Sequence, residues 1–388
     1  MSKWSRRRFM TAFTSGLLGV GLSGKSQTSP SGSGEELKIR RTNTLGKTGL
    51  KVSDVSCGAI SFFEPNVLRY AADMGVTYFD TAESYMNQRS ETYVGQALSP
   101  IRDKVIIATK HGYSPRSDMT KQAIMARMEA SLKRMKTDYV DVALCHGLSD
   151  PLLLDHPDLL EAYAQLKKDG KVRFTGFSTH DAATTLPQAL SRDFVQVVLV
   201  IYNHMEGKTI EPLLEQVRKK GIGVVAMKIF AGGKQGNLMS LVGREVSYPQ
   251  AAIRWVLSNP NVDCCIPTLS SYSHVEEYVA ASGQPLDRKD LEVLAEYRKQ
   301  AGSLYCRVSC SACLSSCPNN VAINDILRYG MYFEDYGMEK AAMGYYAQLE
   351  ESRRPLSCAG CPGPCQSACP HGLEVRDRLL HARDLLRA

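Results

Sequence analysis

Eight short apolar runs alternate with amphipathic stretches between residue 35 and about residue 285, and no other feature limits the fold as strongly. The runs span residues 55–58, 76–80, 105–110, 140–146, 172–178, 195–202, 223–228 and 264–267. They are rich in β-branched residues and do not alternate polar with apolar side chains, which is typical of strands buried on both faces of a parallel sheet. Eight such strands with helices between them, in ~250 residues, predict a (β/α)8 TIM barrel.

Helical patterns separate the predicted strands. They cover residues 120–135, 158–168, 210–219 and 249–257. A doubly wound α/β sheet is the alternative, but it would place a glycine-rich phosphate-binding turn after its first strand, and the sequence has none there. We therefore assign residues 35–285 to the barrel.

Polar residues end three neighbouring predicted strands. Asp80, Lys110 and His146 end the second, third and fourth strands, and Tyr85 follows in the loop after the second. The carboxyl ends of barrel strands meet on one rim, where barrel enzymes carry their active sites. The four side chains are therefore expected to converge there as a catalytic group.

A phenol beside an ammonium group can act as a proton donor. Free tyrosine titrates near ~10, and an adjacent Lys110 paired with Asp80 is expected to lower the pKa of Tyr85. The His146 imidazole would orient a carbonyl oxygen or help to relay the proton. Each residue alone has an ordinary structural explanation, such as a helix cap for Asp80, so only the joint pattern indicates catalysis.

Eight of the twelve cysteines lie in two C-terminal quartets that each end in Cys-Pro. The first quartet comprises Cys306, Cys310, Cys313 and Cys317, and the second comprises Cys358, Cys361, Cys365 and Cys369. Three closely spaced thiolates followed by Cys-Pro is the arrangement by which bacterial ferredoxins ligate [4Fe–4S] clusters. The quartets therefore predict two [4Fe–4S] clusters. Their three-residue spacers leave a single cluster, or a three-iron cluster, as alternatives.

The spacing does not fix which cysteines share a cluster. In two-cluster ferredoxins the fourth cysteine of each quartet ligates the other cluster, which would place Cys369 with the first quartet and Cys317 with the second. Zinc and disulfide bonds are rival interpretations, and both fit such compact quartets poorly. The remaining cysteines, which lie in apolar runs and are expected to be buried hydrophobic residues, are Cys57, Cys145, Cys264 and Cys265.

The N-terminus carries an export pattern. Residues 5–10 read Ser-Arg-Arg-Arg-Phe-Met, a glycine-rich apolar stretch follows, and residues 23–34 are rich in Ser and Gly. The arginine pair resembles a twin-arginine signal, the signal of a pathway that exports folded proteins, so we expect residues 1–34 to be a signal peptide and linker and the protein to be periplasmic. The apolar stretch is too short to span a membrane, so stable membrane insertion is not expected.

The charge balance bears on the class of partner. The chain has 47 Lys and Arg against 40 Asp and Glu, and five of the basic residues but no acidic ones lie in residues 1–34. The remainder is close to neutral, so the sequence gives no indication of nucleic-acid binding.

Residues 40–285 resemble the aldo-keto reductase superfamily. The segments that carry the similarity are 80–85 (DTAESY), 90–98, 108–110 (ATK) and 138–146, with weaker support from 176–178 and 221–228. The resemblance implies that Tyr85 is the general acid, supported by Asp80, Lys110 and His146. It also implies hydride transfer from NAD(P)H to the carbonyl carbon of a small molecule, although the sequence does not select among aldehydes, ketones and sugars.

The same resemblance implies a nicotinamide site at the ends of the later strands. Its expected contacts are Ser178, Gln196, Met227, Lys228, Thr268 and His274. Thr268 and His274 stand where NADPH-dependent members usually have a Lys and an Arg for the 2′-phosphate, and Met227 stands where an aromatic residue usually stacks on the nicotinamide. Two missing cations disfavour a dianionic phosphate, so the preference between NADH and NADPH stays open.

Some aldo-keto reductase relatives carry a C-terminal ferredoxin-like segment, and residues 286–388 resemble it, as a helical linker followed by a small, mainly helical, cysteine-rich domain. The sequence therefore predicts an exported oxidoreductase that couples carbonyl reduction or alcohol oxidation to [4Fe–4S] electron transfer, with a redox partner protein. One alternative is an electron-transfer subunit whose barrel is mainly a docking scaffold. Another is a reductase whose clusters are structural or sense oxygen.

Overall fold

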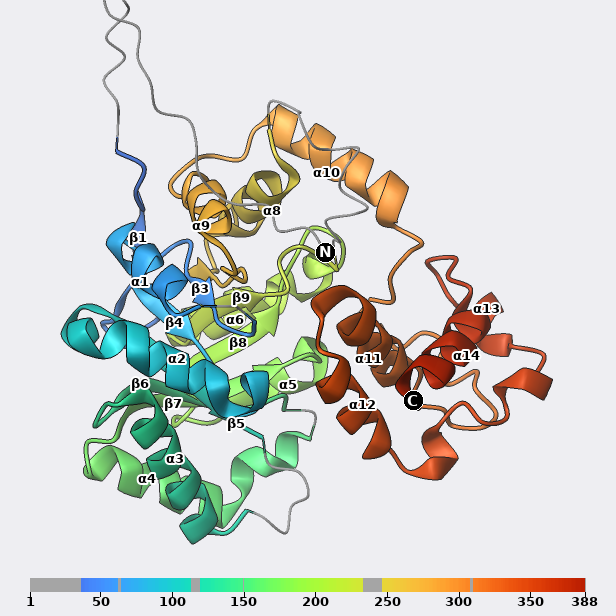
Figure 1. Cartoon of the computed structure of the whole chain (residues 1–388), viewed down its shortest axis with the longest axis horizontal. Helices are drawn as coiled ribbons and strands as arrows, with labels where there is room; N and C mark the ends of the chain where they lie inside the picture. Colours follow the sequence, from blue (N-terminus) through green and yellow to red (C-terminus); the bar gives the residue numbers. More distant parts are fainter. Residues whose placement is uncertain are drawn as a thin grey trace, which may run out of the picture. The chain divides into compact units, whose positions relative to one another are not determined.

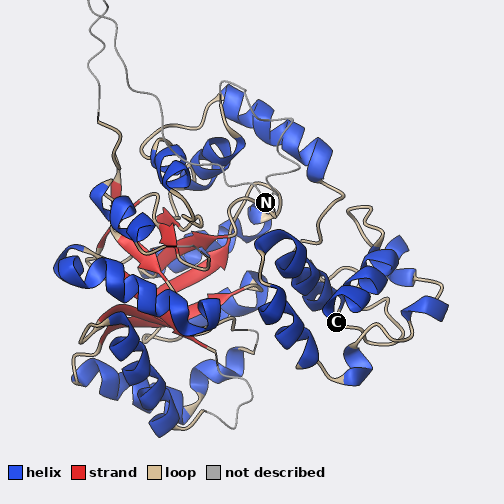
Figure 2. Ribbon diagram, viewed as in Figure 1, coloured by secondary structure: helices blue, strands red, loops and turns tan. Residues whose placement is uncertain are grey.

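A parallel sheet of eight strands forms the centre of the computed structural model, which describes residues 36–61, 64–112, 119–148, 150–232, 246–307 and 310–387. Figures 1 and 2 show these strands with helices around them. The strands are β3 (Cys57–Gly58), β4 (Tyr78–Asp80), β5 (Ile106–His111), β6 (Val140–Cys145), β7 (Val172–Thr179), β8 (Val197–Ile201), β9 (Gly223–Met227) and β10 (Cys264–Cys265). Each strand pairs in parallel with the next along the chain, so every connection crosses over the sheet. The predicted signal segment, residues 1–34, lies outside the described residues.

The first and last strands close the sheet into a barrel. A parallel bridge joins Val55 to Cys265, and the Ser56 amide donates to the Cys265 carbonyl over 2.9 Å. A second bridge joins Gly58 to Thr268. All eight predicted strands are thus confirmed at their expected positions, and the doubly wound alternative is wrong.

An antiparallel hairpin covers the amino-terminal end of the barrel. It consists of β1 (Thr42–Thr44) and β2 (Lys51–Ser53). Leu45, between these strands, belongs to the apolar cluster that fills the barrel interior. Gly46 has φ +51°, and a Cβ there would lie 2.4 Å from the nitrogen of Gly223, the first residue of β9. Only glycine tolerates both the left-handed conformation and this close approach.

Helices and short 3-10 turns cover the outside of the strands. The helices are α1 (Asn66–Asp73), α2 (Arg89–Leu98), α3 (Lys121–Met135), α4 (Pro157–Lys168), α5 (Ala182–Ala189), α6 (Glu211–Lys220), α8 (Tyr248–Leu257) and α9 (Tyr272–Val279). The turns are η1 (Tyr85–Gln88), η2 (Ser99–Lys104), η4 (Pro151–Asp155) and η5 (Gly207–Ile210). Thr120 caps α3 by accepting from the Ala123 amide over 3.2 Å. All four predicted helices are confirmed.

A second group of helices follows the barrel. It begins with α10 (Arg288–Ala301), which starts at a capping box of Asp287 and Asp290. The remaining elements are α11 (Ile323–Tyr336), α12 (Glu339–Ala347), η7 (Glu351–Arg353), η8 (Cys358–Gly360), α13 (Pro364–Ser367) and α14 (Val375–Leu386). Elements α11 to α14 have an apolar cluster of their own, although Leu37–Ala388 form one compact unit. The described part of residues 286–388 contains helices and no strand.

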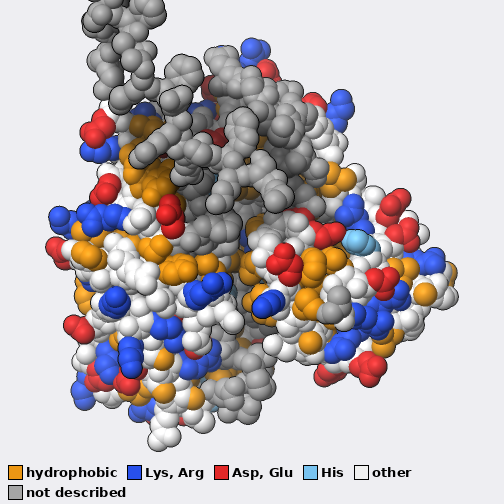
Figure 3. Space-filling model, viewed as in Figure 1, with side chains coloured by type: hydrophobic (Ala, Val, Ile, Leu, Met, Phe, Trp, Pro, Cys, Tyr) orange, Lys and Arg blue, Asp and Glu red, His pale blue; other side chains and the backbone are white. Residues whose placement is uncertain are grey.

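The surface carries charged side chains of both signs (Figure 3). Lys and Arg side chains are interspersed with Asp and Glu side chains over the face in Figure 3. This pattern agrees with the near-neutral charge of the chain after its first 34 residues. Among the described helices, none combines the length and the apolar character that crossing a membrane requires.

Candidate active site and cysteine quartets

Four polar side chains meet at the carboxyl ends of the barrel strands. Asp80 is the last residue of β4, Lys110 lies near the end of β5, and His146 directly follows β6. Tyr85 opens η1, in the loop after β4. The structure therefore brings together the four residues that the sequence predicts as the catalytic group.

Lys110 and Asp80 form a buried ion pair. The Nζ atom of Lys110 contacts Oδ1 of Asp80 and donates to the Thr81 carbonyl over 2.7 Å. Both charged side chains are 1 % exposed. Burial raises the pKa of Asp80 and lowers the pKa of Lys110, and the pairing offsets part of each change. The ammonium group is thus fixed beside the loop that carries Tyr85.

The Tyr85 ring packs against both Lys110 and His146. Lys110 Nζ lies 4.8 Å from the ring centroid, and the His146 imidazole meets the ring edge-on with 5.6 Å between centroids. Burial, and then the Asp80 charge, raises the pKa of Tyr85 well above its ordinary value. The expected lowering by Lys110 is therefore not observed, because the ammonium lies over the ring and its paired carboxylate opposes ionisation of the phenol. Tyr85 keeps its proton at physiological pH, as a general acid requires.

The His146 imidazole is neutral. Burial, together with the charges of Lys110, His111 and Lys228, lowers the pKa of His146 to about 3. A neutral imidazole carries one ring hydrogen and can donate it to a carbonyl oxygen. This electrostatic state favours a role in orienting the substrate over a role as the acid.

Buried polar contacts from α2 hold the strand ends in place. Glu91 accepts from Thr109 Oγ1 over 2.5 Å and from Arg134 Nε over 2.7 Å. The hydroxyl groups of Ser90 and Thr81 lie 2.7 Å apart. Because Thr109 and Thr81 are the direct chain neighbours of the buried ion pair, these contacts fix the backbone that presents it.

Five of the six predicted nicotinamide contacts lie at the same end of the barrel as the catalytic group. They are Ser178 near the end of β7, Met227 and Lys228 at the end of β9, Thr268 after β10, and His274 in α9. Their placement suits a cofactor that lies across these strand ends, and their contacts with it stay a prediction.

Gln196 is the exception among the predicted contacts. It precedes the first residue of β8, at the amino end of that strand. Its side-chain oxygen accepts from Lys167 Nζ over 2.7 Å and from the Thr175 amide over 3.3 Å. The Gln196 carboxamide thus joins the end of α4 to β7, at the opposite end of the barrel from the other five predicted contacts.

Neutral side chains occupy the positions predicted for the adenine end of the cofactor. His274 Nδ1 lies 2.9 Å from Ser270 Oγ, and burial lowers the pKa of His274, so the ring is neutral at pH 7. Thr268 carries no charge, and Glu276 close by accepts from Tyr70 Oη over 2.8 Å. Neither predicted position therefore supplies a cation for a 2′-phosphate.

Helix α11 brings two further side chains to the rim, which the sequence analysis does not identify. Lys228 Nζ donates to Tyr332 Oη over 3.1 Å. Arg328 Nη1 donates to Nδ1 of His180, directly after β7, over 3.1 Å. Arg328 and Tyr332 are four residues apart, a spacing that places them on one face of a helix. The sequence shows this spacing, but it does not show that this face of α11 packs against the barrel rim.

The first group of C-terminal cysteines combines members of both quartets. Burial raises the pKa of Cys306 to about 12, and the neighbouring thiols that add to the rise are Cys313, Cys310 and Cys369. Cys369 belongs to the second quartet in sequence, yet it lies with three members of the first. Cys365 of the second quartet also raises the pKa of Cys313, so the two groups are adjacent.

The second group shows the reciprocal exchange. Burial raises the pKa of Cys358 to about 11, with smaller contributions from Cys317, Cys365 and Cys361. Cys317 of the first quartet thus joins three members of the second, which is the pattern of two-cluster ferredoxins. None of the twelve cysteines forms a disulfide bond. Those that are buried in the barrel, as expected, are Cys57, Cys145, Cys264 and Cys265.

Each cysteine group supplies four thiol donors. Within the described ranges, no three Cys, His, Asp or Glu side chains converge as the ligands of one ion do. The four thiolates around a cube stand farther apart, because each binds a different iron atom. Four thiolates are the donor set that a [4Fe–4S] cluster uses.

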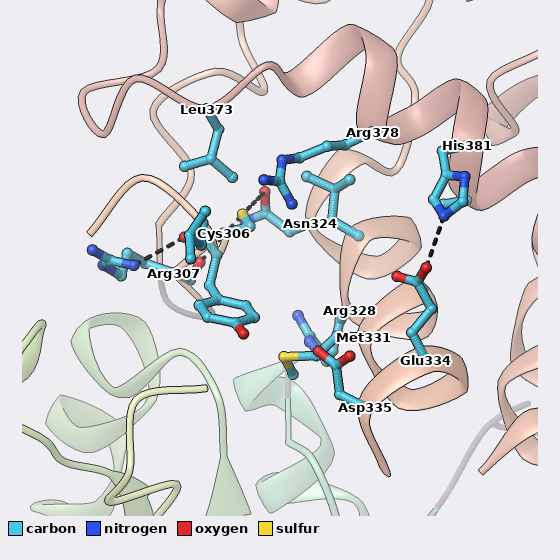
Figure 4. Close-up of a pocket in the computed structure, with 15 residues that line it drawn as sticks. Cys306, Arg307, Asn324, Arg328, Met331, Glu334, Asp335, Leu373, Arg378 and His381 are labelled. Carbon is cyan, nitrogen blue, oxygen red and sulfur yellow. Dashed lines mark hydrogen bonds and ion pairs between the residues drawn. The ribbon is translucent and has the colours of Figure 1, made fainter. Parts of the chain in front are cut away.

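A cavity of about 240 Å³ lies beside Cys306. Its walls come from the segment after α10, from α11 and from α14, as Figure 4 shows. Arg378 of α14 points towards Cys306 in this view. Arg328 lines the cavity and also contacts His180, so a single side chain borders both the cavity and the barrel rim.

Known proteins match this chain over its barrel. A model of the aldo/keto reductase family matches residues 59–237. An L-galactose dehydrogenase from Arabidopsis thaliana is 30 % identical over 278 residues, covering 61 % of this chain and 86 % of that protein. A methylglyoxal reductase from Escherichia coli (strain K12) is 30 % identical over 243 residues, covering 60 % and 83 %. An aldo/keto reductase structure from Klebsiella pneumoniae, in complex with NADP and acetate, has a TM-score of 0.56 at 26 % identity and covers 66 % of this chain and 95 % of that one.

The barrel and its matches define the class of the protein. A closed parallel barrel whose relatives are reductases and dehydrogenases is an oxidoreductase. The chain belongs to the aldo/keto reductase family. The match to the family model ends before α8, so it does not cover the cysteine groups or α11.

Proposed function

We propose that the protein is an exported oxidoreductase that reduces the carbonyl group of an aldehyde, ketone or sugar, or oxidises the corresponding alcohol, with a nicotinamide cofactor. The observation that carries this proposal is the position of Tyr85, whose protonated phenol packs against Lys110 and His146 at the barrel rim. NAD(P)H supplies the hydride when it is bound. Tyr85 donates the proton to the carbonyl oxygen of the substrate.

The other three residues of the group prepare this proton transfer. Neutral His146 donates a hydrogen bond to the carbonyl oxygen and so orients it towards the Tyr85 hydroxyl. Lys110, which its ion pair with Asp80 holds in position, packs over the Tyr85 ring and fixes the orientation of the phenol. Because the ion pair is already formed and buried, the site does not have to reorganise during the reaction.

The cofactor is inferred from a relative and from the strand ends. The Klebsiella pneumoniae aldo/keto reductase is in complex with NADP, and we place the nicotinamide of this protein across the ends of β7 and β9, near Ser178, Met227 and Lys228. The neutral Thr268 and His274 favour NADH, which has no 2′-phosphate to neutralise.

Two [4Fe–4S] clusters complete the proposed electron pathway. One would be held by Cys306, Cys310, Cys313 and Cys369, and the other by Cys317, Cys358, Cys361 and Cys365. The clusters would supply one-electron transfer to a redox partner protein. Export by the twin-arginine pathway is compatible with this cargo, because that pathway carries folded proteins whose clusters are already inserted.

Conversion of Tyr85 to phenylalanine tests the acid assignment. In the Tyr85→Phe variant, kcat for carbonyl reduction is expected to fall by about 10²- to 10⁴-fold, whereas the Kd of the nucleotide should not change, because the ring is kept. Tyr139→Phe is the matched control, since Tyr139 precedes β6 at the opposite end of the barrel, and it should retain full activity. Wild-type activity in Tyr85→Phe would remove Tyr85 from the mechanism.

An anaerobic titration tests the coupling between barrel and clusters. The cluster-loaded protein would be titrated with NADH and then with NADPH while the sulfur-to-iron absorption is followed. Bleaching by either nucleotide supports a single electron pathway. Bleaching by dithionite alone would show that the barrel and the clusters are not coupled.

A second candidate function is an electron-transfer subunit whose barrel is a docking scaffold. The neutral adenine end favours it, as does the contact of Lys228, a predicted cofactor residue, with Tyr332. Calorimetric titration with both nucleotides separates the two functions. Measurable binding of either nucleotide supports the reductase, and no binding supports the scaffold.

A further inference from the structure

Helix α11 lies against the first cysteine group and the barrel rim at once. Asn324, Arg328 and Tyr332 follow one another at intervals of four residues, along one side of the helix. Asn324 Oδ1 lies 3.9 Å from Cys306 Sγ. Arg328 and Tyr332 reach the barrel residues that follow β7 and β9. Tyr332 is also close enough to Tyr85 to contribute to the raised pKa of that phenol.

The hydrogen bonds of α11 leave donors for a further acceptor. Lys228 donates to the oxygen of Tyr332, so the phenol hydrogen of Tyr332 is left to donate elsewhere. The Nε atom of Arg328 is buried and has no hydrogen-bond partner among the described residues. A buried donor of this kind normally meets an acceptor, and here both donors belong to one helix face.

Lys228 and Arg328 are the cations that contact Tyr332 and His180 here. The Lys110 charge is balanced by Asp80. Arg328 forms an ion pair with Asp325, at 3.5 Å between Nη2 and Oδ1, and that carboxylate is 39 % exposed. Glu334 and Asp335 line the cavity that Arg328 borders, and Glu334 contacts His381. The partner of Lys228 is a neutral phenol. An anion at this end of the barrel would therefore find a favourable potential.

The positive charges of Lys228 and Arg328 lower the pKa values of two neighbouring neutral groups, His180 and Tyr332. Burial, and then Lys228 and Arg328, lowers the pKa of His180 well below its ordinary value. Burial alone would raise the pKa of Tyr332, but Lys228 and Arg328 outweigh it and lower that pKa.

We propose that Lys228 of the barrel and Arg328 and Tyr332 of α11 bind a carboxylate on the substrate. The enzyme would then act on carbonyl compounds that carry an acidic group. A planar guanidinium matches the two oxygens of a carboxylate, and Tyr332 adds a hydroxyl donor. Anchoring the acidic group on α11 would turn the carbonyl towards Tyr85 and His146. The inference rests on the proposed carbonyl reduction, and it makes α11 part of the active site.

A matched pair of aldehydes tests this specificity. 4-Formylbenzoate and its methyl ester differ in the charge at one end, and their kcat/KM values would be compared on the holoenzyme with NADH and with NADPH. The wild type is expected to prefer the acid. Arg328→Gln should lower the ratio of kcat/KM for the acid to kcat/KM for the ester by about tenfold or more. Arg328→Lys should keep part of the preference, because it retains the charge.

Control variants separate charge recognition from loss of structure. Arg69→Gln removes the same charge from a surface ion pair of α1. It should not change kcat/KM for either aldehyde. Equal kcat/KM values for acid and ester in the wild type would overturn the proposal. So would a ratio that Arg328→Gln does not change, or a loss of NAD(P)H affinity in that variant without a change in the ratio, since the charge would then serve the cofactor.

A binding measurement keeps the inference distinct from the proposed function. If the wild type reduces neither aldehyde, the carbonyl-reductase proposal fails. The affinity for 4-(hydroxymethyl)benzoate, measured by calorimetry, still decides the anion site. At least about tenfold weaker binding in Arg328→Gln than in the wild type supports the site, and equal binding overturns it.

Discussion

Lys228 Nζ lies 3.1 Å from Tyr332 Oη, although 104 positions separate the two residues in the chain. The contact joins the end of β9 to α11. The Arg328–His180 contact repeats the connection at the end of β7. The helical segment therefore meets the barrel at the rim that carries Tyr85, which gives the C-terminal part of the chain a direct route to influence the chemistry of the barrel.

The buried ion pair is expected to be strongly coupled. Lys110→Met would leave the Asp80 carboxylate buried without its partner, at a cost of about 3–5 kcal/mol in the free energy of unfolding. The double variant with Asp80→Asn should lose clearly less than the sum of the two single variants, because it buries no unpaired charge. Urea unfolding of the four proteins measures this coupling. Additive losses would show that the two charges do not stabilise each other.

The pH profile of carbonyl reduction is expected to be flat near neutrality. The pKa of His146 is about 3 and that of Tyr85 lies well above its ordinary value, so neither group changes its charge between pH 6 and 9. The measurement is kcat/KM for an aldehyde over this range at a saturating nucleotide concentration. A break near pH 6.5 that disappears in His146→Gln would contradict the neutral, buried histidine.

Acid should destabilise the fold through His204. Its side chain is 4 % exposed, and burial, followed by Arg298 and Arg307, lowers its pKa to about 3. A folded pKa below the unfolded value means that this stability is fully present above pH 6.5 and is lost as the pH falls towards 3. His204→Gln, which can still bond to Tyr248, should therefore reduce the pH slope of the unfolding free energy below pH 6.5 by up to about 1.4 kcal/mol per pH unit.

A second buried histidine also contributes to the pH dependence of the unfolding free energy. His111 is also buried, with a pKa of about 4, so His204→Gln should reduce the slope without removing it. Unfolding curves at pH 4.5, 5.5 and 7.5 would measure the effect. An unchanged slope in the variant would show that His204 does not titrate with unfolding.

The exchange of cysteines between the quartets has a spectroscopic consequence. Cys369→Ser should perturb the same cluster as Cys306→Ser, and a different one from Cys358→Ser. Iron analysis should show loss of up to about half of the iron in each variant, and electron paramagnetic resonance after reduction should identify the remaining cluster. Cys145→Ala, in the barrel core, is the control and should keep both clusters. A Cys369→Ser spectrum that matches that of Cys358→Ser would refute the exchange.

Several features of this protein follow from local patterns in its sequence. Apolar runs and helical periodicity predict the eight strands and four of the helices, because each pattern reports the burial of a short segment. The positions of Asp80, Lys110 and His146 at strand ends place them on one rim, because all parallel strands end on the same side of a barrel. Cysteine spacing likewise indicates cluster ligation without any knowledge of the fold.

Only the tertiary structure decides what depends on register, burial and packing between distant segments. It turns Gln196 away from the rim, because the carboxamide bonds to Lys167. It raises the pKa of Tyr85, because neighbouring elements desolvate the phenol and the Asp80 charge opposes its ionisation. It brings Arg328 to the barrel, since a helix face carries no record in the sequence of the surface that it will meet. The sequence alone thus determines the barrel and the rim position of Asp80, Lys110 and His146, and the packing of α11 determines what surrounds them.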